Sequence, residues 1–395
     1  MSTEPIKIGY SMSLSGPLGA NGRTALLAQR IWEEDVNRRG GLLGRPVQLI
    51  CVDDRTDPTS VAGIYQRLLD VDKVDLVAGG YGNNSLMPAM PMVIDRKRYF
   101  VGLMGLSVNK QFQYPGYFAM IPTGPDSSAA LTEGFFDVAA KQSPRPETVA
   151  IVAADADFTR NTIHGATVNA ARNGFRIISE NKYPLSTKDF APLLRGLRST
   201  SPDILFLSSY LSDSIGLVRG LHDAGLEPRL VGGAMIGPQS SSVQTALGPL
   251  LNGLINYEYW LPTSKMMVPE VGEFIERYQA RAASQGADAL GYYVAPTAYA
   301  QMQVVEQAIA ATQSLDDATL VSYTRDAVFR TVMGDVKFAA GGEWSTSRLL
   351  TVQFRDIRSN EVAEFMGART RVIVSPDALA TGELAYPYAN ARRAS

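Results

Sequence analysis

The sequence predicts an α/β protein made of two doubly wound parallel-sheet lobes, joined by a three-strand hinge around a ligand cleft. A set of four short apolar runs, rich in Val, Ile and Leu, occurs twice along the chain. Continuous apolar runs of this kind are typical of parallel strands whose two faces are both buried. The segments between the runs are amphipathic and long enough for crossover helices. Because doubly wound sheets bind ligands at the carboxyl ends of their strands, we expect the functional residues there.

The expected strands form two sets of four, followed by a third section in which the order of strands and helices is different. The first set is 6–10, 47–52, 74–78 and 99–103, and the second is 148–152, 175–178, 203–207 and 229–232. A further strand is expected at 254–260, and helices are expected at 271–284, 292–312 and 321–329. A turn at 340–342 predicts that 334–338 and 349–354 pair as an antiparallel hairpin.

The helices after residue 269 have no counterpart in the second set of strands, so we expect them to cover the first lobe. Lobe 1 would hold 5–121 and 257–331, and lobe 2 would hold 122–256 and 332–374. Residues 375–395 would form a tail that wraps the surface or hangs loose. The chain would cross between the lobes near 121–123, 256–257 and 331–334. Three such crossings permit bending, which is the geometry of a closing clamp.

The composition excludes several classes of protein. A formal net charge of −2, with acids and bases interspersed, gives no electrostatic footprint for nucleic acid. No apolar run approaches the roughly 18 to 20 residues that a membrane span requires. The single cysteine, Cys51, lies in an expected strand, and we expect its thiol to be buried and unpaired. The polar start shows no secretory signal, so either a signal was removed or the protein is cytoplasmic.

The chain also lacks the common catalytic and metal-binding patterns. It contains no Gly-x-Ser-x-Gly elbow, no P-loop and no His-Glu-x-x-His motif. Its two histidines, His164 and His222, fall in expected helices of lobe 2, and His222 is expected at the surface near a helix end. No cysteine pair or carboxylate cluster has ligand spacing, so we expect no metal and no cofactor.

A glycine-rich turn at 16–22 follows the first strand and opens a helix. It resembles a dinucleotide-binding loop, but its spacing is Gly-x-x-Gly-x-x-Gly, with Pro17 inside it. The acids that end the second strand, Asp53 and Asp54, come too late in the sequence to act as a ribose-binding acid. The simpler interpretation is a turn whose backbone N–H groups can meet a polar ligand group.

Three blocks of sequence resemble the solute-binding proteins of branched-chain amino-acid ABC importers, which have the type 1 periplasmic binding protein fold. The blocks are 8–17, then 37–47 followed by Asp53 and Asp54, and finally 329–338. The resemblance covers nearly the whole chain, but these three blocks belong to the structural framework and say little about the ligand. It implies a binding set at the strand ends of both lobes that includes Asn84, Ser85, Ser107, Phe158 and Tyr210. The residues of the same loops and of the hinge add Met104, Met235 and Tyr257 as candidate apolar wall, and Ser13 and Asn83 complete the candidate set.

One departure from the family pattern bears on the ligand. Amino-acid-binding members usually pair the ligand ammonium with a carboxylate after the last strand of lobe 2, but the corresponding loop here, 232–237, contains no acid. A buried ammonium without a partner costs several kcal/mol. Asp155, Asp157 or Asp213 could substitute from neighbouring loops. Apolar walls with a few hydroxyls and amides suit an aromatic or branched carboxylic acid, or an amide.

The resemblance favours a receptor that captures a small organic solute by lobe closure and delivers it to a membrane permease. The expected location is the periplasm. A cytoplasmic small-molecule sensor of the same fold, regulating a partner protein, is the alternative, and the missing signal supports it. An enzyme is the least favoured reading, because no nucleophile–base or paired-carboxylate arrangement can be assembled from the strand-end loops.

Overall fold

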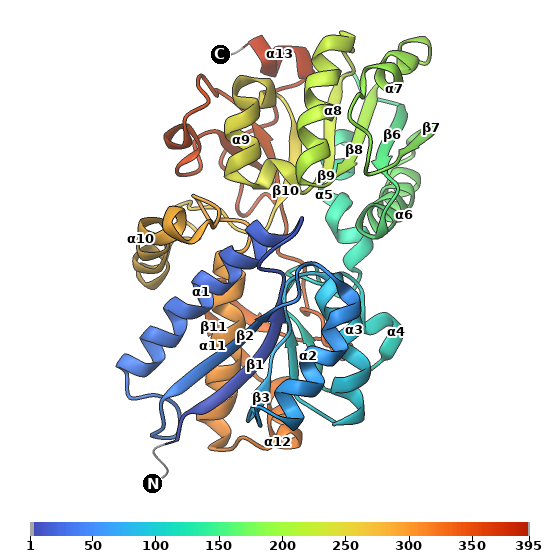
Figure 1. Cartoon of the computed structure of the whole chain (residues 1–395). Helices are drawn as coiled ribbons and strands as arrows, with labels where there is room; N and C mark the ends of the chain where they lie inside the picture. Colours follow the sequence, from blue (N-terminus) through green and yellow to red (C-terminus); the bar gives the residue numbers. More distant parts are fainter. Residues whose placement is uncertain (1–3, 394–395) are drawn as a thin grey trace. The chain divides into compact units, whose positions relative to one another are not determined.

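The computed structural model describes residues 4–393 and divides the chain into two compact units. Unit 1 comprises the chain up to Pro125 together with Met266–Ser347, and unit 2 comprises Asp126–Lys265 together with the chain from Arg348 (Figure 1). Each unit is an α/β body with its own parallel sheet. Among residues 4–393, no helix combines the length and apolar character that a membrane span requires.

Unit 1 is built on parallel strands in the order β2-β1-β3, with a second parallel pair, β4-β5, beside them. The Gly79 N–H donates to the Val101 carbonyl at 2.8 Å, and the Gly82 N–H donates to the Leu103 carbonyl at 3.0 Å, so the two ladders continue into each other. A hairpin of β11 and β12 completes the strands. Their bounds are β1 Ile6–Met12, β2 Val47–Asp53, β3 Leu76–Val77, β4 Phe100–Gly102, β5 Tyr117–Ala119, β11 Val328–Thr331 and β12 Gly334–Lys337.

Helices cover the strands of unit 1, and α11 is tied to both ladders by one buried side chain. Gln301 of α11 is fully buried, and its amide donates to the carbonyls of Gly79 and Val101 at 2.8 and 2.7 Å. Gln29 of α1 donates to Gln301 at 2.8 Å, which adds α1 to the same network. The helices are α1 Gly19–Arg38, α2 Pro58–Asp70, α3 Asn83–Asp95, α4 Val108–Phe112, α10 Pro269–Ala282, η4 Ala283–Gln285, α11 Ala295–Thr312 and α12 Asp317–Asp326.

Unit 2 contains a seven-stranded sheet in the order β14-β13-β10-β9-β8-β6-β7. The strands from β7 to β10 run parallel, whereas β13 is antiparallel to β10 and to β14. Every residue of β8 and of β9 is buried, as continuous apolar runs require. The strands are β6 Thr148–Ala154, β7 Arg176–Tyr183, β8 Ile204–Ser209, β9 Leu230–Met235, β10 Ile255–Glu258, β13 Leu350–Phe354 and β14 Arg371–Ser375.

The helices of unit 2 are mostly crossovers between its parallel strands. The pair α5 and α6 pack against each other, and the Asn169 amide of α6 donates to the Ala129 carbonyl of α5 at 2.8 Å. The helices are α5 Ser127–Ala140, α6 Asp157–Arg172, α7 Ala191–Gly196, η1 Leu197–Ser199, α8 Leu211–Ala224, η2 Gly237–Gln239, α9 Ser241–Leu247, η3 Gly248–Leu251, η5 Val362–Phe365 and α13 Tyr388–Arg393.

The doubly wound, parallel-sheet class is confirmed, and all eight repeated strands are present. The predicted hairpin of 334–338 with 349–354 is wrong, because β12 pairs with β11 while β13 joins β10 and β14. The predicted helix 321–329 is also wrong at its end, since α12 stops at Asp326. Along Val328–Thr331 exposed and buried side chains alternate, which is the period of a strand and not of a helix.

The boundaries of the units differ from those expected for the lobes. The last crossing follows Ser347 and not 331–334. The reason is aromatic packing within unit 1, where the Phe338 ring lies 5.1 Å from the ring of Phe118 and 6.1 Å from that of Phe329. The segment 376–393 belongs to unit 2, where the Tyr388 N–H donates to the Arg229 carbonyl at 2.8 Å.

One single-residue prediction is refined and another needs correction. Cys51 as a whole residue is half-buried in β2, but its thiol is free and buried, which raises the pKa of Cys51 to about 12. His222 is half-buried and not a plain surface residue. It lies 3.0 Å from the Leu250 carbonyl through Nε2 and 3.0 Å from the Arg392 guanidinium through Nδ1, so it helps to hold the tail.

Candidate functional site

The carboxyl ends of the unit 1 strands meet around one buried carboxylate, Asp54. Its Oδ1 accepts hydrogen bonds from the Ser13 hydroxyl at 2.6 Å and from the Thr56 N–H at 2.9 Å. Its Oδ2 accepts from the hydroxyls of Ser11, at 3.1 Å, and Ser85. The three serines are fully buried and Asp54 is 2% exposed. This cluster therefore fastens the loops after β1 and β2 to the start of α3.

Close backbone packing supports the same edge. The first turn of α1 lies directly on the end of β1, because a Cβ on Gly22 would come within 1.8 Å of the Ser13 carbonyl oxygen. Asp53 accepts hydrogen bonds from the Leu14 and Ser15 N–H groups at 2.9 and 3.2 Å and from the Ser15 hydroxyl at 2.7 Å. These bonds outweigh the effect of burial and lower the pKa of the Asp53 carboxyl. Asp53 thus organises the glycine-rich turn.

The other predicted residues of unit 1 lie on two neighbouring loops. The Asn83 side chain accepts from the Leu106 N–H at 2.8 Å and donates to the Leu106 carbonyl at 3.1 Å, which ties the loop after β3 to the loop after β4. Asn84 is exposed, whereas Ser107 is half-buried and has a left-handed φ of 53°. Met104 is 6% exposed. Of the predicted polar residues of this edge, Asn84 is therefore exposed, Asn83 and Ser107 are half-buried, and Ser13 and Ser85 are buried.

A tyrosine pair at this edge was not among the residues selected from the sequence. The Tyr81 and Tyr293 hydroxyls are 3.0 Å apart, and their rings meet edge to face with centroids 6.3 Å apart. The Asn21 amide at the start of α1 donates to the Tyr81 hydroxyl at 2.9 Å. Tyr81 could have been found, because it lies in the glycine-rich loop after β3. Tyr293 precedes α11 and follows no strand, so no sequence signal identifies it.

Unit 2 contributes a second aromatic pair at the carboxyl ends of its strands. Phe158 at the start of α6 and Tyr210 after β8 meet edge to face, with centroids 5.8 Å apart and an interplanar angle of 68°. The Phe158 N–H donates to the Tyr210 hydroxyl at 3.2 Å. Both side chains are half-buried, and burial raises the pKa of the Tyr210 phenol. The structure thus brings these two predicted residues together.

Met235 and Tyr257, the remaining predicted residues, are buried in unit 2. Met235 at the end of β9 is fully buried, and the Asn256 side chain bonds to both its N–H and its carbonyl at 2.9 Å. Tyr257 on β10 is 3% exposed and packs edge to face on Tyr259, with centroids 5.4 Å apart. A ligand role for either residue remains a prediction.

The acids that could substitute for the missing counter-charge are engaged within unit 2. Asp155 and Asp157 both form ion pairs with Arg160, and both are exposed. Asp213 is 4% exposed, and its Oδ2 accepts a hydrogen bond from the Tyr183 hydroxyl at 2.7 Å. Burial raises the pKa of the Asp213 carboxyl, which favours its neutral form.

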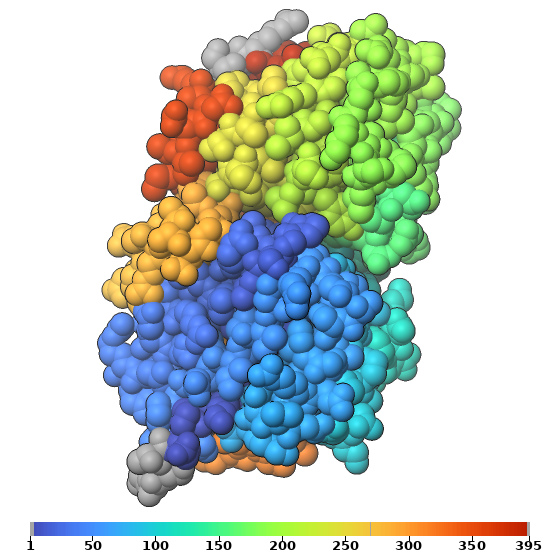
Figure 2. All heavy atoms as spheres, viewed as in Figure 1, coloured from blue at the N-terminus to red at the C-terminus, as the bar shows by residue number. Residues whose placement is uncertain are grey.

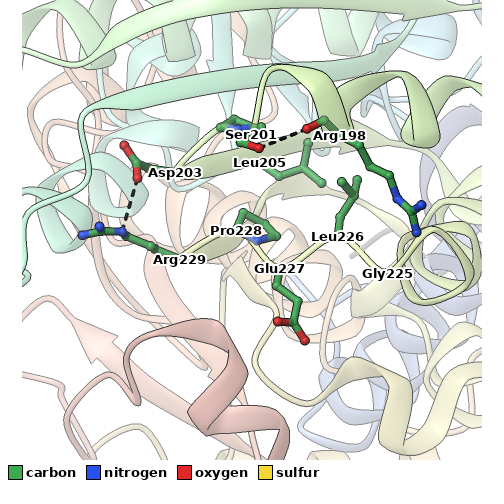
Figure 3. A pocket seen from close by; sticks show the side chains of 10 residues that line it. Arg198, Ser201, Asp203, Leu205, Gly225, Leu226, Glu227, Pro228 and Arg229 are labelled. Carbon is green, nitrogen blue, oxygen red and sulfur yellow. Dashed lines mark hydrogen bonds and ion pairs between the residues drawn. The ribbon is translucent and has the colours of Figure 1, made fainter.

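A hollow of about 400 Å³ in unit 2 lies at the amino ends of β8 and β9, opposite to the edge that carries Phe158 and Tyr210 (Figure 3). Three of its four charged side chains are already engaged. Arg229 pairs with Asp203 at 3.2 Å, and Arg198 donates to the Ala224 carbonyl. The fourth, Glu227, is exposed and has no ion-pair or hydrogen-bond partner for its side chain among the described residues, so this hollow presents one free carboxylate. Within residues 4–393, no group of His, Cys, Asp and Glu has the arrangement of a metal site.

Comparisons with known proteins identify the family. The family described as "Periplasmic binding protein" matches residues 5–354, and the chain belongs to this family, with the type 1 fold. The "Leu/Ile/Val-binding protein homolog 8" of Brucella abortus (strain 2308) is 25% identical over 371 residues, covering 92% of this chain and 87% of the relative.

Two solved structures share the fold. One is an ABC transporter substrate-binding protein from Sphaerobacter thermophilus, with a TM-score of 0.79 and 20% identity, covering 94% of this chain and 97% of that one. The other is a solute-binding protein of an ABC transporter from Rhodopseudomonas palustris BisB5 in complex with 3,4-dihydroxybenzoic acid. It has a TM-score of 0.76 and 17% identity, covering 90% of this chain and 94% of that one.

Proposed function

We propose that this chain is the solute-binding receptor of an ABC importer, acting in the periplasm, and that its solute is a small aromatic carboxylic acid. It would deliver this solute to a membrane permease and catalyse no reaction itself. The family membership and the Leu/Ile/Val-binding relative support the receptor role. None of the relatives reported above is named as a cytoplasmic sensor, so that alternative is not carried further.

The observation that carries the choice of solute is the aromatic pair at the carboxyl edge of each sheet. Tyr81 and Tyr293, which are 5% and 8% exposed, form this pair in unit 1, and the half-buried Phe158 and Tyr210 form it in unit 2. An aromatic solute that stacks on one such ring gains about 0.5–1.5 kcal/mol beyond the burial of its area. The structure of a fold relative with 3,4-dihydroxybenzoic acid shows that the fold accommodates such a molecule.

The charges of unit 2 support the same choice. An amino-acid solute brings an ammonium group, and 232–237 offers it no carboxylate. Asp155 and Asp157 are paired with Arg160, and Asp213 bonds to Tyr183. An unpaired ammonium in a closed site costs several kcal/mol, which corresponds to at least about a hundredfold in affinity.

Calorimetric titration tests the proposal. Protein freed of co-purified solute is titrated with benzoate, 3,4-dihydroxybenzoate, leucine and valine, and mass spectrometry identifies the solute that was carried through purification. We expect the aromatic acids to bind at least about a hundredfold more tightly than the amino acids. Tight leucine binding without a response to the aromatic acids would refute the choice of solute. A leucine affinity that Asp213→Asn then abolished would identify Asp213 as the missing counter-charge.

Lobe closure, which the resemblance implies, remains a prediction with its own test. Small-angle scattering should show a smaller radius of gyration when saturating solute is added. The solute should also raise the melting temperature by mass action, adding about 2.7 kcal/mol at one hundred times Kd. A scattering curve that does not change at saturation would count against closure, whichever solute binds.

A further inference from the structure

A shallow groove in unit 1 has a charge pattern that the solute site does not explain. It lies between α1 and the segment formed by α10 and η4, which pack beside each other (Figure 1), and its volume is about 440 Å³. Figure 2 shows α1 at the surface of unit 1, with residues of α10 next to it. The groove is lined by Leu14, Arg23, Leu26, Leu27, Arg30, Glu34, Arg281 and Gln285.

Most charges of the groove are matched, and one is not. Arg281 forms a double hydrogen bond with Glu34, at 2.7 and 2.9 Å, and Arg277 shares the same carboxylate at 3.3 Å. Arg30 pairs with Glu33 at 2.6 Å. Arg23, by contrast, has no carboxylate within ion-pair distance among the residues that the structure describes.

The Arg23 guanidinium is nevertheless held in a fixed position. Its Nε donates to the Gly286 carbonyl at 2.7 Å and its Nη1 donates to the Leu14 carbonyl at 2.6 Å. Both acceptors are neutral, so the positive charge stays uncompensated, and Nη2 remains available to a partner. A guanidinium that is already ordered loses little side-chain freedom when it binds a carboxylate.

We infer that this groove is a docking surface for an acidic segment of the membrane permease, with an Asp or Glu side chain bonded to Arg23. The inference rests on the proposed receptor function. Three observations support it. The charge of Arg23 is complementary to a carboxylate, and the half-buried Leu14 and Leu26 offer apolar contact beside it. Leu14 also follows the carboxyl end of β1, so the groove borders the edge that carries the candidate solute residues. A protein that receives the solute must approach that edge.

Charge variants of Arg23 in the full chain test the inference. Arg23→Glu reverses the charge, Arg23→Gln removes it, and Arg23→Lys keeps the charge while losing the fork of hydrogen bonds. Arg195→Glu changes an exposed arginine of α7 in unit 2 and serves as the control. Two quantities are measured for each variant: affinity by calorimetry and uptake by cells that express the cognate permease. Uptake is measured with a labelled form of the solute that mass spectrometry identified.

The expected pattern separates docking from solute binding. All variants should bind the solute with the affinity of the original protein. Uptake should fall at least about tenfold in Arg23→Glu, fall less in Arg23→Gln, and stay near the original level in Arg23→Lys and Arg195→Glu. Normal uptake by Arg23→Glu would overturn the inference, as would an equal loss in Arg23→Glu and Arg23→Lys, which would indicate a structural brace. Failure of the unaltered protein to bind or import any small solute would refute the receptor function itself.

Discussion

Replacing Ser85 with alanine should cost stability and leave solute affinity largely unchanged. The Ser85 hydroxyl donates to Asp54 and lies 3.2 Å from the Ser11 hydroxyl, and all three side chains are buried. The alanine leaves a buried carboxylate with one donor fewer, which costs about 1.5–3 kcal/mol. For a unit of this size, 1 kcal/mol lowers the melting temperature by about 2–4 °C, so the expected decrease is roughly 3–12 °C.

Thermal and urea unfolding measure this loss of stability, and two further variants serve as comparisons. Ser322→Ala changes an exposed serine of α12 and should alter the free energy of unfolding by less than about 0.5 kcal/mol. Asn84→Ala removes an exposed amide beside Ser85 and should weaken solute binding while the melting temperature stays constant. A Ser85→Ala protein that unfolds like the original but binds solute five- to a hundredfold more weakly, a loss of about 1–3 kcal/mol, would refute the reasoning. It would show that Ser85 contacts the solute, as the family resemblance implies.

Three other properties can be tested on the same protein. Phe158→Ala removes the ring that meets Tyr210 and should weaken binding of an aromatic acid by roughly two- to tenfold, measured by calorimetry, and an unchanged affinity would place the solute elsewhere. Because the pKa of Cys51 is raised to about 12, iodoacetamide at pH 8 should label the thiol slowly in the native protein and rapidly in urea, and equal rates would contradict the burial of the thiol. Burial, with Arg392 nearby, lowers the pKa of His222 below its ordinary 6.5. The neutral imidazole therefore contributes stability at pH values above 6.5, and this contribution is lost as the pH falls through the lowered pKa. The decrease in melting temperature between pH 7.5 and pH 5.5 should therefore be smaller in His222→Gln than in the original protein, and equal decreases would exclude this contribution.

The strands could be predicted because each is a short, continuous apolar run. A parallel sheet that is buried on both faces is the structure in which such runs are expected. The short strand β5, Tyr117–Ala119, was missed because three residues carry no periodicity. The pairing of β12 was mispredicted for a different reason. A turn signal at 340–342 indicates a reversal of the chain, but the sequence does not show that Phe338 packs on aromatic rings of unit 1.

The sequence predicted which residues lie near the carboxyl ends of the strands, but it did not predict the direction in which their side chains point. Phe158 and Tyr210 follow strands of unit 2 and do meet at its carboxyl edge. Ser13 and Ser85 also follow strands, yet both hydroxyls turn inward to Asp54. A polar residue after a strand can face a ligand or brace a neighbouring loop. The choice depends on an acceptor that is distant in sequence, and one sequence alone does not reveal that acceptor.

The segment that ends in α13 offers a practical attachment point for a reporter. Its contacts hold it at the amino end of β9, where the Tyr388 N–H meets the Arg229 carbonyl, and Asn390 is exposed there. A cysteine introduced at Asn390 would be the readily alkylated thiol of the native protein, because the only other one is Cys51. A dye coupled at that position would be fixed to unit 2, at the end of the sheet opposite to Phe158 and Tyr210. Paired with a second dye on unit 1, it would test whether solute capture closes the lobes, without occupying the edge where we expect the solute.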